Sequence, residues 1–406
     1  MKVGYLTSQY PAPSHTFIRR EVEALRMKGV DVHTFSVRRP EADFTSRYPG
    51  DQRAYESTQY LLPVGAWRLA RIHLTTLFRQ PARYLAALLL AVGHRAPGLR
   101  ALVWSLFYFG EAVVLAETLR RLRIQHLHSH FANVAGSVGL ISSTLLSIGW
   151  SITLHGDMDF DYPSRLLLAA KARAARFIAC VSYFGRAQAM RVIPCEHWHK
   201  LVVVRCGVDV SLFGTPGPSQ PPREGQRLRI LSIARLSPEK GQIGLIQAFA
   251  GLVERGTDAE LRIIGEGPMR GEIEREIAAR RLGGRCVLLG MKTEGEVVAE
   301  LAQADIVALS SFLEGLPVVL MEALAMERAV VAPCVAGVPE LVIHERTGLL
   351  FAPSNWADLE AQLARLAGDP DLRADLGREG RRVVLREFDA SRAVEPLAVR
   401  FTSSAA

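Results

Sequence analysis

The chain has 406 residues, of which 49% are hydrophobic, so it is long enough for two domains with separate cores and is not a disordered chain. The net charge of +8 is unevenly spread: residues 1–210 hold 26 Lys and Arg against 14 Asp and Glu, whereas residues 211–406 hold 23 against 27. Five scattered cysteines without a CxxC pair favour neither a disulfide framework nor a zinc site, and they indicate a reducing compartment.

The first residues, MKVGYLTSQYP, lack the long apolar stretch of a signal peptide and predict a strand instead. The longest apolar runs, 84–92 and 101–110, are about half as long as a helix that spans a membrane. We therefore expect no transmembrane segment and a cytoplasmic location.

Short β-branched or apolar runs alternate with helical patterns along the whole chain, which is typical of parallel sheets built from βαβ units. The expected fold class is therefore α/β, with two Rossmann-like domains. Strands are predicted over 2–6, 30–36, 124–128, 151–154, 177–181 and 201–205 in the first half, and over 228–234, 260–264, 286–289, 306–309, 329–332 and 348–351 in the second.

A linker is predicted over 213–226. Its sequence, FGTPGPSQPPREGQ, contains four prolines and three glycines, through which neither a helix nor a strand can continue. It separates an N-terminal domain, 1–212, from a C-terminal domain, 227–387. The last segment, 388–406, predicts a helix with one apolar face that packs back on the first domain. The crevice between the two domains is the expected ligand site.

Residues 62–123 interrupt the alternation of strands and helices. They hold nine arginines but only two acidic residues, Glu111 and Glu117, interleaved with many Trp, Tyr, Phe and Leu side chains. Helices of this composition lie in membrane interfaces, where guanidinium groups meet anionic headgroups. We expect a basic, aromatic-rich helical insertion that contacts an anionic membrane surface. The alternative is an ordinary helical insertion packed on the sheet, with solvated arginines.

Two carboxylates border a predicted anion site in the second half. After the strand at 306–309, a loop carries Glu314 and Gly315, and Pro317 stands where a helix is predicted to begin, with Glu322 in its first turns. Loop amides and a helix N-terminus bind phosphate, and carboxylates accept hydrogen bonds from sugar hydroxyls, so a polyol phosphate is the expected ligand. Alternatively, Glu322 is only favoured by the helix dipole and Glu314 is a solvated loop residue.

A second anion-binding element, ARLSPEKG at 234–241, follows the first strand of this domain and opens its first helix. Arg235 supplies a planar fork of donors and Lys240 a mobile charge, a pairing suited to a diphosphate. Lys240 alone could be a surface residue. Two such elements at the same edge of one sheet favour a diphosphate site.

Four motifs, RLSPEKG at 235–241, GEGPMR at 265–270, EGLPVVLMEAL at 314–324 and AGVPELV at 336–342, together resemble the donor domain of retaining GT-B glycosyltransferases of family four. The resemblance covers residues 228–352. It implies a GT-B fold, in which two Rossmann-like domains face each other across a cleft. It also implies transfer of a hexose from a nucleotide diphosphate sugar with retention of configuration.

The same resemblance assigns roles to individual residues. Arg235 and Lys240 would hold the diphosphate, Glu322 the ribose and Glu314 the hexose, while backbone near Met291 would touch the base. The implied catalytic residues are His155, Arg235, Lys240 and Glu314, and the implied donor-binding residues are Arg235, Lys240, Gly265, Met291, Glu314, Gly315, Leu316, Pro317 and Glu322.

The N-terminal loop resembles the family more loosely. YPAPSHTFI at 10–18, followed by Glu21, resembles the start of glycosyltransferases that make colanic-acid-like exopolysaccharides, with His15 in place of the usual glutamate. This resemblance implies that Ser14, His15 and Thr16 form a first loop on the acceptor side of the site. The simpler interpretation is that Ser14 and Thr16 only cap a helix.

His128 and His130 end one predicted strand and His155 ends the next, so these side chains should lie at the carboxyl edge of the sheet. No HExxH or similar spacing is present, so no metal site is expected, and His126 and His128 are expected to be core or capping residues. The family resemblance implies that His155 contacts the transferred hexose and that His130 lies in the acceptor cleft.

These observations predict a retaining hexosyltransferase of exopolysaccharide or cell-surface glycan synthesis, with a nucleotide sugar donor and a lipid-linked or other glycan acceptor. The expected location is the inner face of the cytoplasmic membrane, with no nucleic acid, metal or cofactor. One alternative is a non-catalytic GT-B protein that binds a sugar nucleotide within a glycan assembly complex. Nucleic-acid binding by the basic half is a further alternative, but no known motif for it is present.

Overall fold

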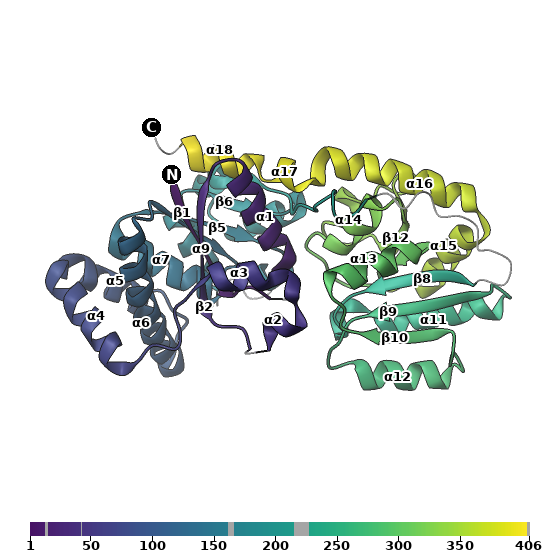
Figure 1. Cartoon of the computed structure of the whole chain (residues 1–406), viewed down its shortest axis with the longest axis horizontal. Coiled ribbons are helices and arrows are strands. Elements are labelled where there is room, and N and C mark those ends of the chain that lie inside the picture. The colour runs from purple at the N-terminus through teal and green to yellow at the C-terminus, as the bar shows by residue number, and fades with distance from the viewer. Residues whose placement is uncertain (13–14, 42, 161–165, 215–226, 404–406) are drawn as a thin grey trace. The chain divides into compact units, whose positions relative to one another are not determined.

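The structure is a computed structural model that describes residues 1–12, 15–41, 43–160, 166–214 and 227–403 (Figure 1). Two compact units make up the chain: unit 1 combines Met1–Cys206 with Ala393–Ala406, and unit 2 is Gly207–Arg392. From residue 215 onward, the predicted linker lies outside the described residues.

Unit 1 is built on a seven-stranded sheet with the order β3-β2-β1-β4-β5-β6-β7, in which every pairing is parallel. All six predicted strands are confirmed. The seventh was missed because two residues are too short to show a pattern. The strands are β1 (Lys2–Gln9), β2 (Asp31–Arg38), β3 (Gln59–Tyr60), β4 (His126–His130), β5 (Gly149–Leu154), β6 (Ile178–Cys180) and β7 (Leu201–Val203).

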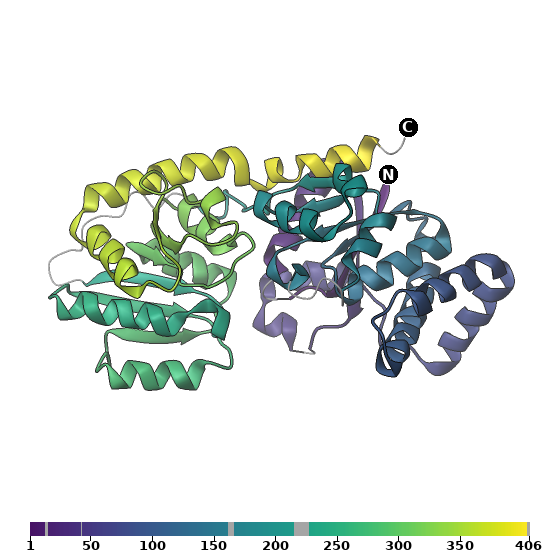
Figure 2. The ribbon, with the colours of Figure 1, turned by 180° about the vertical axis from the view of Figure 1, so that it is seen from behind.

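Helices surround this sheet, and the predicted helical segment 62–123 forms three of them, α4, α5 and α6, which contact one another. They lie on the outer side of α7, which itself packs on β1, β4 and β5 (Figures 1 and 2). The helices of unit 1 are α1 (Thr16–Met27), α2 (Phe44–Arg47), α3 (Gln52–Ser57), α4 (Ala66–Arg79), α5 (Pro81–Gly93), α6 (Leu99–Leu122), α7 (Val134–Leu146), α8 (Asp157–Phe160), α9 (Leu168–Ala174), α10 (Tyr183–Val192) and α18 (Glu395–Ser403).

The long helix α6 changes one expectation. Within the described residues it is the one helix long and apolar enough to cross a membrane, which a count of uninterrupted apolar runs did not detect. Its second half, however, is packed in the core of unit 1, where Phe109, Val113, Leu115 and Leu119 are buried. We interpret α6 as a core helix whose first half extends beyond the core.

Unit 2 repeats the design with a six-stranded parallel sheet of order β10-β9-β8-β11-β12-β13, and all six predicted strands are confirmed. Its strands are β8 (Leu228–Ile233), β9 (Ala259–Ile264), β10 (Cys286–Gly290), β11 (Ile306–Ala308), β12 (Ala329–Pro333) and β13 (Leu349–Phe351), and its helices are α11 (Gln242–Glu254), α12 (Arg270–Ala279), α13 (Glu294–Gln303), α14 (Val318–Ala325), α15 (Trp356–Gly368), α16 (Pro370–Val383) and, at its end, α17 (Ala390–Ala393).

The strand order reverses once in each sheet, between β1 and β4 in unit 1 and between β8 and β11 in unit 2. At such a point the loops that follow the two central strands diverge to opposite faces of the sheet and leave room for a ligand. The loops after β1, β4, β8 and β11 are therefore where binding residues are expected.

The C-terminal helix returns to unit 1, as predicted from its apolar face. On α18, Leu397 and Phe401 are fully buried, and Lys28, the residue directly after α1, forms an ion pair with Glu395. The Phe401 ring lies 5.5–6.2 Å from the rings of Tyr5, His126, His128 and Phe177, measured between centroids.

Replacing Phe401 by alanine is expected to lower the free energy of unfolding by about 3–5 kcal/mol, because a large cavity would open beside the sheet. Val399→Ala on the same helix is the matched control, since Val399 is 48% exposed and should cost well under half as much. Urea denaturation followed by circular dichroism compares the two variants. Equal effects would contradict the docking of α18 on unit 1.

Candidate functional site

Two loops meet at the switch point of unit 2. The loop after β8 ends at Gly241, and the loop after β11 begins near Ser310. The Ser310 hydroxyl donates to the carbonyl of Lys240 (2.9 Å), and the amide of Phe312 donates to the carbonyl of Glu239 (2.8 Å). Gly241 has a φ of +63°, and a Cβ added there would lie 2.2 Å from the Ser310 carbonyl oxygen, so the approach requires glycine.

This junction brings Lys240 and Glu314 into direct contact, which the sequence did not predict. The Lys240 ammonium lies 2.6 Å from Glu314 Oε1, and the Ser311 hydroxyl donates to the same oxygen at 2.6 Å. Both side chains are largely shielded, with 21% and 11% of their surfaces exposed. In this state, Glu314 neutralises the cation that was assigned to the diphosphate.

Arg235 is more open, with 67% of its side chain exposed, and it pairs with Glu239 at 2.6 Å. Burial alone would raise the pKa of Glu239, but hydrogen bonds from Ser237 and Arg235 outweigh burial and lower it to about 2. Glu239 was missed as a site residue, although its position four residues after Arg235 at a helix start could have indicated the pair.

The turn after β9 supports the same loop from the other side. Gly265 has a φ of +145°, and a Cβ there would lie 2.0 Å from the carbonyl oxygen of Ala234. Gly265 thus acts sterically in this structure, by letting the loop of Arg235 pack closely. Met291 follows β10, and its side chain is 49% exposed.

The loop after β11 leads into α14. The helix begins at Val318, one residue later than predicted, because Pro317 has an extended ψ of 109° and occupies the N-cap position. Gly315 is partly exposed and Leu316 is buried, while Glu322 is partly exposed one turn into the helix. The first turn of α14, in which the Leu320 amide donates to the Pro317 carbonyl at 3.1 Å, therefore lies with its positive helix end at the same sheet edge as Lys240.

In unit 1, His130 and His155 end neighbouring strands and contact each other. Nδ1 of His130 lies 2.9 Å from Nε2 of His155, and the rings stack with centroids 5.1 Å apart. Burial, followed by the charge of neighbouring histidines, lowers the pKa of both rings well below the usual value, so both are neutral. In a neutral pair, one of these two nitrogens carries a proton and donates it in a hydrogen bond to the other. This hydrogen bond fixes the orientation of the His155 ring.

His130, which was expected in the acceptor cleft, has no exposed side-chain surface in this structure. Its ring contacts that of His155. His155 itself is partly exposed and is flanked by the rings of Phe17 and Phe131 at 4.8 and 4.5 Å.

The first loop also differs from expectation. Thr16 is the first residue of α1 rather than its cap, and the N-cap position belongs to His15, whose side chain makes no capping bond. His15 instead lies with Nδ1 3.1 Å from the carbonyl oxygen of Gln9, and its ring is 5.4 Å from that of Phe131. Ser14 lies outside the described residues.

Asp159, which no motif indicated, holds the two strand-end loops of unit 1 together. Its carboxylate accepts hydrogen bonds from the amides of Ala132 (2.6 Å) and His155 (2.8 Å). Buried Lys171 donates to the carbonyls of Ala132 and Leu166 at 2.5 and 2.7 Å. Burial lowers the pKa of Lys171 to about 7, against a smaller raising effect of Asp159. The backbone around His155 is therefore fixed by a buried polar network.

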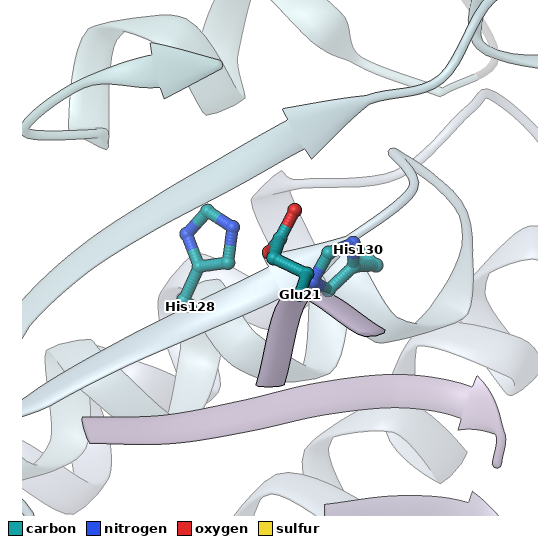
Figure 3. A group of neighbouring side chains, drawn as sticks. All are labelled: Glu21, His128 and His130. Atoms are coloured by element: carbon teal, nitrogen blue, oxygen red, sulfur yellow. The ribbon is translucent and has the colours of Figure 1, made fainter. Parts of the chain in front are cut away.

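A buried group of possible metal ligands lies behind these histidines (Figure 3). Ligand atoms of Glu21, His128 and His130 lie within 4.8 Å of one another. Both nitrogens of His128 are already hydrogen-bonded, to Ser151 and Thr153 at 2.7 and 2.8 Å. The Tyr5 hydroxyl donates a hydrogen bond to Oε1 of Glu21 at 2.9 Å. We interpret the group as a hydrogen-bonded polar core. His126 joins it through Ser151, in agreement with the core role expected for both histidines.

A cavity of about 260 Å³ adjoins the loop after β8. It is lined by apolar residues such as Pro238, Phe312 and Trp356 and contains none of the predicted site residues. We do not assign the donor to it.

Comparisons with known proteins bear on the family and the fold. The family model described as glycosyl transferases group 1 matches residues 218–383. The putative colanic acid biosynthesis glycosyltransferase WcaL of Escherichia coli is 28% identical over 96% of both chains, and the amylovoran biosynthesis glycosyltransferase AmsK of Erwinia amylovora is 28% identical over 92% of both. The crystal structure of Anabaena Alr3699/HepE with UDP-glucose superposes with a TM-score of 0.74 at 17% identity, covering 99% of this chain and 100% of that one. The predicted GT-B fold is confirmed.

Glu21 should give unit 1 a measurable pH dependence. Burial raises its pKa from 4.5 to about 7, against a smaller lowering effect of the Tyr5 hydrogen bond. The folded state therefore binds more protons than the unfolded state between these values, and Glu21 lowers stability as the pH rises through this window. Glu21→Gln should leave the melting temperature nearly unchanged at pH 4.5 and should raise stability at pH 8 by about 3 kcal/mol. The exposed Glu23→Gln is the control. A difference that does not depend on pH would contradict this origin.

Gly241→Ala should destabilise unit 2 by about 3 kcal/mol or more, because strain at positive φ adds to the clash with Ser310. Gly256→Ala is a matched control: Gly256 has a φ of +92° but no atom within 4 Å of an added Cβ, so strain alone should cost about 1 kcal/mol. Urea denaturation measures both. Similar losses would show that the contact between the two loops is not tight.

Proposed function

We propose that the chain, whose residues 218–383 match the glycosyl transferases group 1 model, transfers a hexose from a nucleotide diphosphate sugar to a glycan acceptor with retention of configuration. One observation carries the proposal: Arg235, Lys240, Glu314 and the first turn of α14 gather at the switch point of one parallel sheet. Fixed cations and helix amides at such an edge suit a diphosphate.

Donor binding would rearrange the ion pairs of the free protein. A diphosphate carries more negative charge than one carboxylate, so it would draw Lys240 from Glu314 and Arg235 from Glu239. Glu314, released from Lys240, could then accept hydrogen bonds from hexose hydroxyls. Glu322 would bind the ribose, and backbone near Met291 would contact the base. UDP and UDP-glucose are bound by the Anabaena protein of similar fold, which supports a nucleotide sugar as donor.

In the proposed step, the bond between the anomeric carbon and the diphosphate oxygen breaks, and the acceptor oxygen bonds to that carbon on the same face. The acceptor proton passes to the leaving phosphate oxygen. Arg235, Lys240 and the amides of α14 would stabilise the charge that develops there, so no metal or other cofactor is proposed. His155 would contact the hexose through Nδ1, since its Nε2 faces His130.

Two curated relatives are named for exopolysaccharide synthesis, colanic acid for one and amylovoran for the other. We therefore propose that the acceptor is a growing exopolysaccharide unit linked to a lipid. Transfer would then take place on the cytoplasmic side of the membrane, where the protein would be a peripheral component.

Arg235→Ala and Lys240→Ala should each lower turnover about 10- to 1000-fold, because each removes a charge that stabilises the leaving diphosphate. Arg255→Ala is the matched control: Arg255 is 69% exposed, pairs with Glu360 in the same unit and should leave turnover unchanged. The assay follows release of nucleoside diphosphate from UDP-, GDP- and ADP-sugars with a lipid-linked acceptor.

NMR of the first product in that assay reports the anomeric configuration. An inverted product would contradict retention, and near-normal turnover of both variants would contradict the assigned diphosphate site. If a sugar nucleotide raises the melting temperature but no acceptor gives turnover, the non-catalytic alternative is favoured.

A further inference from the structure

We infer that the outer faces of α4, α5 and the first half of α6 form a surface that docks on an anionic lipid bilayer. The choice of partner rests on the proposed function, since a lipid-linked acceptor has to be reached at a membrane. The surface itself is argued from exposure and charge, and its test needs no sugar.

Apolar exposure is concentrated on these helices. Ten of the twenty exposed large apolar side chains of the described residues lie between positions 67 and 107. Trp67, Phe78 and Leu99 are 91%, 80% and 77% exposed. Soluble surfaces rarely carry large apolar side chains in such density without a partner. The ten, called here the docking surface, are Trp67, Leu74, Phe78, Leu85, Leu89, Leu99, Val103, Trp104, Leu106 and Phe107.

These side chains follow helical spacing, so they form stripes rather than scattered points. Leu74 and Phe78 are four residues apart on α4, as are Leu85 and Leu89 on α5. The opposite faces of the helices are already used: the core of unit 1 buries Ile72 of α4, Ala87 and Ala91 of α5 and Phe109 of α6. Each helix therefore has one face in the core and a second apolar face without a described partner.

Positive charge accompanies the apolar stripes. No acidic residue occurs from residue 57 to 110, whereas six arginines do. Among the residues that the structure describes, no carboxylate forms an ion pair with any of the five that lie on α4, α5 or the start of α6, namely Arg68, Arg71, Arg79, Arg83 and Arg100. Unneutralised guanidinium groups beside exposed aromatic rings complement anionic headgroups above an acyl layer.

Other occupants fit this surface less well. Two copies docked through it would bring arginines together with no acidic residue between 57 and 110 to neutralise them. Nucleic acid would match the charge but would leave Trp67, Phe78 and Leu89 without apolar contacts. A spanning α6 would have to remove its buried second half from the core of unit 1. Interfacial docking uses both features of the surface and leaves the core intact.

Flotation of the full-length protein with vesicles tests the inference. The protein should float with phosphatidylglycerol vesicles, and less so with phosphatidylcholine vesicles or at high salt. Charge reversal in Arg68→Glu/Arg71→Glu should lower the partition coefficient about tenfold or more, whereas the exposed Arg53→Glu on α3 should not. Phe78→Ser/Phe107→Ser should also weaken binding, in contrast to Met27→Ser, whose side chain is 78% exposed on α1. Unchanged melting temperatures show that the variants fold.

Tryptophan fluorescence locates the contact. Trp67 and Trp104 should give a blue shift on binding and should be quenched by brominated lipids, and Trp67→Phe/Trp104→Phe should remove both signals while retaining flotation. Equal binding of all variants, tighter binding to duplex DNA than to vesicles, or a dimer lost in Phe78→Ser/Phe107→Ser would each overturn the inference. Vesicle binding without transfer activity would leave it standing and contradict only the proposed function.

Discussion

The switch point of the sheet in unit 2 depends on one close approach between two backbone segments. Gly241 lets the Ser310 carbonyl lie where a Cβ would otherwise stand, and the two loops at the switch point are joined by hydrogen bonds on either side of that contact. Lys240 and Glu314 are 74 residues apart in sequence, and this junction alone brings them within 2.6 Å. The cations at this sheet edge are thus neutralised within the protein itself, by Glu239 and Glu314.

Unit 1 buries polar side chains within its parallel sheet. His126 and His128 lie on β4, and hydroxyls of Ser151 and Thr153 on the neighbouring strand form hydrogen bonds with their rings. A hydroxyl can rotate either to donate or to accept a hydrogen bond. Each neutral histidine ring therefore has a hydrogen-bond partner without a charged group being buried beside it. The result is a rigid polar layer behind His155, which keeps that ring oriented at the sheet edge.

The fold could be predicted, and the two loop motifs could be placed at one sheet edge, because both signals are local in sequence. Parallel strands produce apolar runs, and RLSPEKG and EGLP follow two of those runs directly, which places Arg235 and Glu314 at the same edge. The pairings of Lys240 with Glu314 and of His130 with His155 could not be predicted, because they depend on how loops pack. Asp159 was missed for the same reason: a lone acid shows its role only when the amides it binds come together.

The arginines of unit 2 and those of α4 and α5 differ in whether acidic residues neutralise them. In unit 2, many arginines form ion pairs with acidic residues, as Arg229 does with Glu260 and Arg262 does with Glu300. These ion pairs neutralise the arginines and connect neighbouring elements. On α4 and α5 no acid is near in sequence, and the charge stays available to an external partner. The same helices bury their other faces in the core of unit 1, so an anion bound there would be held by rigid helices rather than by a loop. The docking proposed above would give a use to this basic segment, which the sheet itself does not require.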